Sequence, residues 1–122
     1  MYDKILFGCR DIDELNIPPH IKHIDPYAFS FCKNLEFFLI HENSELLTIG
    51  ENAFTNTSIE NIEIPKKLLS IGKSAFYKCQ SLKSIKIPKN SELNKIGELA
   101  FAHTKIERIF IPPHIEIIEQ FT

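Results

Sequence analysis

The chain has 122 residues, of which 43% are hydrophobic and 25% are charged, and its formal net charge is −2. This composition is ordinary for one folded domain, and so small a net charge gives no global attraction to nucleic acid or to an anionic membrane. No apolar run approaches the ~20 residues of a membrane span, and residues 1–9 are too short and too acidic for a secretory signal.

Five short segments of the form apolar-x-x-apolar-x-Ile follow one another along the chain, at residues 12–17, 35–40, 59–64, 82–87 and 106–111. The last three residues of each segment alternate with period two, which predicts half-buried β-strands. Pro follows four of the five and ends the strand, because proline cannot donate to a ladder. Since the units share one shape, we expect the strands to stack in parallel, ~4.8 Å apart.

Between these strands the phrase Ile-Gly-x-x-Ala-Phe occurs four times, at residues 24–29, 49–54, 71–76 and 96–101, with Asp in place of Gly in the first copy. We expect the glycines to allow a tight bend and the x-x-Ala-Phe segment to form one helical turn. The repeated Ala should let neighbouring coils approach. The repeated aromatics should form a stacked core ladder, which comprises Phe29, Phe54, Phe76 and Phe101.

The spacing of the copies defines the organisation of the chain. Successive strand-ending isoleucines are 23, 24, 23 and 24 residues apart, so two unit types alternate and the true period is 47. Self-similarity of this kind predicts a stack of repeats with a long surface. We expect a single domain, 1–122, made of a partial unit 1–17, units 18–40, 41–64, 65–87 and 88–111, and a partial unit 112–122.

The phrases at residues 71–82 and 85–88 carry a resemblance to a known family. They resemble the BspA-like leucine-rich repeat, whose unit is close to I-x-I-P-x-x-L-x-x-I-G-x-x-A-F-x-x-C-x-x-L, and the match runs roughly over residues 5–121. The resemblance implies a leucine-rich-repeat-like right-handed solenoid, with a parallel β-sheet on one face and short helical or extended turns on the other.

The same resemblance implies a role in protein contacts. Family members are known as surface adhesins of mucosal bacteria and parasitic protists that bind host matrix or cell-surface proteins. The Asn-Ser-Glu-Leu and Thr-Ser-Ile-Glu variants, at residues 43–46 and 57–60, look like those of protist members. A cell-surface location follows from the resemblance. A cytoplasmic location is the alternative, because the sequence shows no export signal or membrane-spanning segment of its own.

We expect the cysteines and histidines to have packing and turn roles and not to form a chemical site. Cys9, Cys32 and Cys79 each lie three residues after the Phe position, inside the predicted coil. We expect buried free thiols, because the count is odd and no export signal is present, although Cys9 and Cys32 are close enough in the stack to reach one another. Zinc would need ligands beyond His20, His23 and His114. The sequence therefore predicts no metal, no cofactor and no catalytic residues.

The variable outward positions of the strands are the candidate binding surface. They are Phe37 and Leu39, Asn61 and Glu63, Ser84 and Lys86, and Arg108 and Phe110. Phe37, Leu39 and Phe110 are large apolar residues where a solenoid surface is expected to be polar, which is typical of a protein-binding hot spot. The alternative is that a terminal segment or a second chain covers them.

Charge along this face is graded from acidic to basic. Acidic residues come first (Asp13, Glu14, Glu36, Glu60 and Glu63), basic residues follow (Lys83, Lys86 and Arg108), and Glu107 is an exception. Such a gradient could steer a partner or favour head-to-tail association. The main prediction is a non-enzymatic module that binds a protein ligand on the strand face. The alternative is a structural unit that self-associates through uncapped ends, because an unpaired terminal strand is a template for another strand.

Overall fold

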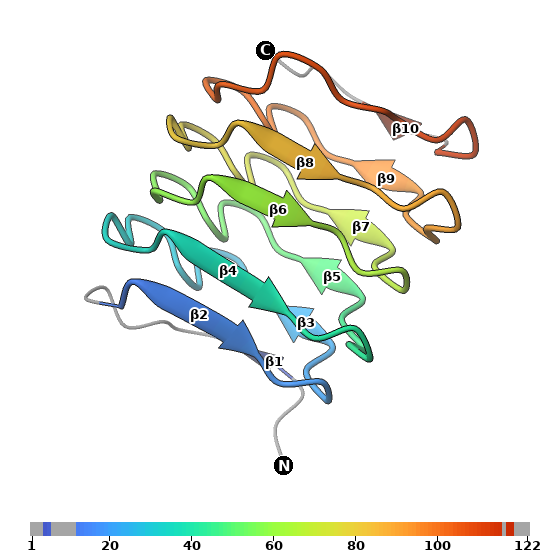
Figure 1. The fold of residues 1–122 in the computed structure, drawn as a ribbon, viewed down its shortest axis with the longest axis horizontal. Coiled ribbons are helices and arrows are strands. Elements are labelled where there is room, and N and C mark those ends of the chain that lie inside the picture. Colours follow the sequence, from blue (N-terminus) through green and yellow to red (C-terminus); the bar gives the residue numbers. More distant parts are fainter. Residues whose placement is uncertain (1–3, 6–11, 116, 119–122) are drawn as a thin grey trace.

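The computed structural model describes residues 4–5, 12–115 and 117–118, which wind as a stack of rungs with parallel strands (Figure 1). The longer strands form one row: β2 (Glu14–Ile17), β4 (Phe37–Ile40), β6 (Asn61–Glu63) and β8 (Ser84–Lys86). Two-residue strands form the other row: β1 (Lys4–Ile5), β3 (His23–Ile24), β5 (Thr48–Ile49), β7 (Ser70–Ile71), β9 (Lys95–Ile96) and β10 (Ile117–Ile118). The predicted parallel solenoid is confirmed.

The continuous sheet runs through the short strands. Its order is β1-β3-β5-β7-β9-β10, and the Ile residues that precede each Gly position stand in register, for example Ile49 with Ile71. The row of longer strands is instead divided into two pairs, β2-β4 and β6-β8. Residues 106–111, expected to be a strand, follow the same path without joining a ladder.

The breaks in this row coincide with a change in the spacing of the units. Eleven residue steps separate Phe29 from Ile40 and Phe76 from Ile87, whereas ten separate Phe54 from Ile64 and Phe101 from Ile111. Each break lies where an eleven-step unit is followed by a ten-step unit. One backbone hydrogen bond spans each break, from Ser58 N to Leu35 O (2.9 Å) and from Lys105 N to Leu82 O (2.8 Å).

The predicted aromatic ladder forms the centre of the core. Phe29, Phe54, Phe76 and Phe101 stack with ring centroids 5.4, 5.2 and 5.5 Å apart and nearly parallel planes. Buried Ala residues precede each ring, and columns of buried Ile and Leu flank it. Each rung therefore buries its apolar face against its neighbours, which is why the repeat needs to be stacked to be stable.

The glycines serve stacking and not bending, contrary to the expectation from the sequence. None of the described glycines has a positive φ. A Cβ added to Gly72 would lie 2.7 Å from Glu51 N, and one added to Gly97 would lie 2.6 Å from Lys73 N, both in the backbone of the preceding rung. Glycine at this position lets adjacent rungs come within hydrogen-bonding distance.

The helical turn expected at x-x-Ala-Phe is not formed. The residue before each Ala and the second residue after each Phe have φ between 55° and 63°, for example Tyr27 and Phe31. Left-handed residues at this frequency exclude an α-helix and give consecutive tight turns instead. Alternate N–H groups are then free to donate to the next rung, as from Phe29 N to Ala53 O (2.8 Å). The turns thus contribute a third row of hydrogen bonds between rungs.

Candidate protein-interaction surface

The strand face is formed by the outward side chains of β2, β4, β6, β8 and residues 106–111. Burial alternates along the strands, so that Ile62 and Ile85 are buried while the side chains on either side of each are exposed. All eight residues of the predicted surface are exposed and lie on this one face. The period-two pattern in the sequence therefore identified the orientation of these side chains correctly, and their binding role stays a prediction.

The middle of the strand face is polar, and its side chains are paired with each other. Ser84 Oγ donates to Asn61 Oδ1 at 2.6 Å, and Lys86 Nζ lies 3.9 Å from Glu63 Oε1. The Lys86 and Glu63 side chains are 76% and 72% exposed, so their ion pair adds little to stability. Both charges remain available to a partner.

The large apolar residues lie on either side of this polar centre. Phe37 and Leu39 on β4 are 53% and 49% exposed, and Phe110 is 59% exposed. The register of β2 places Glu14 beside Phe37 and Asn16 beside Leu39, so the apolar side chains of β4 have no apolar neighbour on that strand. A partner that covers such side chains would gain a binding free energy of about 25 cal/mol for each Å² of apolar surface removed from water.

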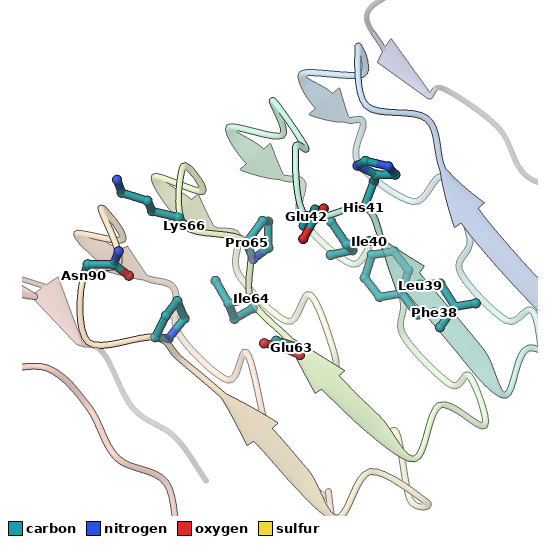
Figure 2. Close-up of a pocket in the computed structure, with 11 residues that line it drawn as sticks. Phe38, Leu39, Ile40, His41, Glu42, Glu63, Ile64, Pro65, Lys66 and Asn90 are labelled. Atoms are coloured by element: carbon teal, nitrogen blue, oxygen red, sulfur yellow. The ribbon is translucent and has the colours of Figure 1, made fainter.

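A groove of about 320 Å³ lies next to Leu39, where the ladder between β4 and β6 is broken. It is lined by residues 38–42, residues 63–66, Pro88 and Asn90. Figure 2 shows residues 38–42 and 63–66 at the ends of β4 and β6 and in the turns that follow, and Asn90 in the turn after β8. This groove was not predicted from the sequence. The signal for it is the ten-step spacing between Phe54 and Ile64.

The cysteine column is structural in the part of the chain that the structure describes. Cys79 is a buried free thiol whose Sγ donates to Phe54 O at 2.9 Å and lies 3.3 Å from Thr57 Oγ1. Burial raises its pKa, which keeps the thiol protonated and unreactive. Cys32 is buried as predicted, and Cys9 lies outside the described residues, so the prediction for that pair stays open.

The histidines take part in surface and turn contacts. His23 Nδ1 is 2.8 Å from Thr48 Oγ1 on the neighbouring short strand, and His114 is exposed. Across residues 4–5, 12–115 and 117–118, no group of three or more His, Cys, Asp or Glu residues is placed to hold a metal ion. The same residues include no helix with the length and apolar character needed to cross a membrane.

Comparison with known proteins assigns the fold to a family. A model described as a BspA type leucine rich repeat region matches residues 1–122 with six copies. The chain therefore belongs to the BspA-type leucine-rich repeat family. A search of curated proteins finds no match.

Solved structures agree with this assignment. The chain is similar to the pneumococcal vaccine antigen PcpA, with 31% identity and a TM-score of 0.81 over 86% of this chain and 26% of that one. A leucine rich cell surface protein from Faecalibacterium prausnitzii A2-165 (23% identity, TM-score 0.60) matches over 88% of this chain and 35% of its own. A leucine-rich repeat protein from Bacteroides ovatus ATCC 8483 (24%, 0.51) matches over 91% and 40%. The last two share the fold, and the chain spans well under half the length of all three.

Proposed function

We propose that this chain is a non-catalytic protein-interaction module that binds a protein ligand on its strand face, in the manner of a surface antigen or adhesin. Membership of the BspA-type family supports a repeat module of this kind. The descriptions of two similar structures, as a vaccine antigen and as a cell surface protein, support a location at the cell surface. The ligand class that fits this setting is a host matrix or cell-surface protein.

The observation that carries the proposal is the exposure of Phe37, Leu39 and Phe110 at outward positions of a regular stack. The rungs beneath them are joined by backbone hydrogen bonds and a continuous core, so the backbone that carries these side chains is held in place before a ligand arrives. A preorganised surface loses little entropy on binding. Aromatic anchors beside charged residues are the usual composition of a binding hot spot.

The groove next to Leu39 extends this surface. Its walls combine apolar groups from Ile40 and Pro65 with the charges of Glu63 and Lys66. An apolar side chain of a ligand can enter between β4 and β6 while the charged groups at the rim contact its polar neighbours. The strand face and the groove together offer both the burial and the directional contacts that a protein ligand requires.

The proposal is tested with Phe37→Glu and Phe110→Glu. The immobilised chain is exposed to purified host extracellular matrix proteins, and binding is measured by surface plasmon resonance. We expect each variant to lose at least about tenfold in affinity, because truncating a hot spot costs 2 kcal/mol or more. Tyr27→Glu is the matched control, since Tyr27 is 58% exposed but lies in a turn away from the strand face. Folded Phe37→Glu and Phe110→Glu variants that bind like the wild type would refute the proposal.

A further inference from the structure

The strand face of one copy of the chain is complementary to the strand face of a second copy whose rungs run in the opposite order. In chain order the last four of the five rungs present Phe37 and Leu39, then Asn61 and Glu63, then Ser84 and Lys86, then Arg108 and Phe110. The large apolar side chains are therefore on the first and the last of these four rungs, and the two polar rungs between them carry opposite charges. We infer that one partner of this face is a second copy of the chain, packed face to face about a two-fold axis.

The axis that produces this match runs parallel to the strands and passes between β6 and β8. It keeps the direction of the strands and reverses the order of the rungs. Leu39 of one copy then meets Phe110 of the other, and Glu63 meets Lys86, with each contact made twice by symmetry. Arg108 of one copy faces Phe37 of the other, where a guanidinium can lie over the aromatic ring. The Leu39–Phe110 contact is apolar and the Glu63–Lys86 contact pairs an acid with a base, so neither of the two central charges is left without a partner.

The structure gives the register of the two central polar rungs directly. Asn61 pairs with Ser84 and Glu63 with Lys86 across the β6-β8 ladder. The hydrogen bond from Lys105 N to Leu82 O is equivalent to the hydrogen bond from Ser58 N to Leu35 O, 47 residues earlier in the chain. Residues 106–111 therefore sit on β8 as the β6 rung sits on β4. Ile109 and Ile111 pack against the core, which leaves the side chains between and before them outward.

The distribution of charge over the whole stack favours the same arrangement. Residues 12–64 contain nine acidic and two basic side chains, a net charge of −7, whereas residues 65–115 contain ten basic and three acidic side chains, a net charge of +7. Reversing the rung order sets the acidic half of each copy against the basic half of the other. A pair with the same rung order would place Lys86 beside Lys86 and is disfavoured by repulsion.

Geometry also sets the expected strength of the pair. Three strands of three or four residues and one further rung, at ~4.8 Å spacing and ~3.3 Å per residue, cover roughly 250 Å², well below the ~800 Å² per partner of a standard interface. The dimer is therefore weak, and it depends on salt because its charges are exposed. It is closed at two copies, whereas contact through the ends of the solenoid would continue into longer assemblies.

Charge reversal with rescue tests the inference. Sedimentation equilibrium is measured for the wild type, Glu63→Lys, Lys86→Glu and an equimolar mixture of the two variants. We expect the wild type to reach a monomer–dimer equilibrium at high concentration and each variant alone to associate at least about tenfold more weakly. The mixture should recover, because both contacts between unlike copies become Lys–Glu pairs. Glu45→Lys, an exposed change of the same charge in a turn, is the control and should dimerise like the wild type.

Each other outcome overturns the inference: a monomer at every concentration, assemblies larger than two, a dimer insensitive to Glu63→Lys, or a mixture that does not recover. The exposed Glu63–Lys86 pair contributes little to folding, so both variants should fold, which circular dichroism confirms. The inference rests on the proposed function because it uses the same binding face. The two fail separately. If the wild type is a monomer and Phe37→Glu abolishes binding to matrix proteins, only the proposed function is supported. If the wild type is a dimer and Phe37→Glu still binds matrix proteins, only the inference is supported.

Discussion

Replacing Gly72 by Ala should destabilise the solenoid even though its backbone conformation is open to any residue. At a negative φ, Gly→Ala normally stabilises by about 0.4–1 kcal/mol, because the unfolded chain loses freedom. At Gly72 the new Cβ would lie 2.7 Å from Glu51 N and 2.8 Å from Gly50 C, distances that require the rungs to separate. Overpacking of this kind costs about 1–3 kcal/mol. The separation also stretches the bond from Gly72 N to Ile49 O, now 2.8 Å.

We therefore expect a net loss of about 1 kcal/mol in the free energy of unfolding, which is the overpacking cost less the gain from the unfolded chain. Urea denaturation followed by far-ultraviolet circular dichroism measures it. Lys73→Ala, an exposed neighbour, should stay within about 0.5 kcal/mol of the wild type. Gly97→Ala meets nearly the same contact and should lose a similar amount. A Gly72→Ala variant as stable as the wild type, or more stable, would show that glycine is not needed for the approach of the rungs.

Three further predictions concern the core, the turns and the buried thiol. Phe54→Ala should cost about 3–5 kcal/mol in urea denaturation, because the ring is fully buried between two others, and a loss below 1 kcal/mol would contradict the ladder as the source of stability. Phe31→Asn should raise stability by about 0.5–1 kcal/mol, since asparagine tolerates the left-handed conformation and Phe31 is half exposed; a lower melting temperature would contradict this. Cys79 should resist alkylation by iodoacetamide at pH 8 until the chain unfolds, as read by peptide mass spectrometry, because burial raises its pKa. Rapid alkylation of the folded chain would contradict this prediction. Since the pKa of Cys79 is higher in the folded chain than the unfolded value of 9.0, its contribution to the free energy of unfolding should fall as the pH rises past 9.0.

The features that depend on side-chain pattern could be predicted from the sequence. The 47-residue period predicted the stack, and fixed spacing placed Phe54 and Phe76 in one ladder. Period-two alternation predicted that Ile62 and Ile85 face the core while Glu63 and Lys86 face outward. These properties follow from each unit by itself, because strand geometry alone decides which side of the rung a residue occupies.

The features that depend on contacts between rungs were decided by the tertiary structure. Two-residue strands such as β5 and β7 are too short to show any periodicity, so the continuous sheet was not predicted. The sequence-based predictions of a bend at Gly72 and of a helical turn at Tyr27 and Phe31 were also wrong, because both features arise from the position of the backbone one rung away. The groove beside Leu39 lies where a ten-step unit is stacked on an eleven-step unit, so it is a feature of two rungs together. A hydrogen bond between rungs joins residues more than 20 positions apart, so its geometry is set by how whole rungs stack and not by any local pattern.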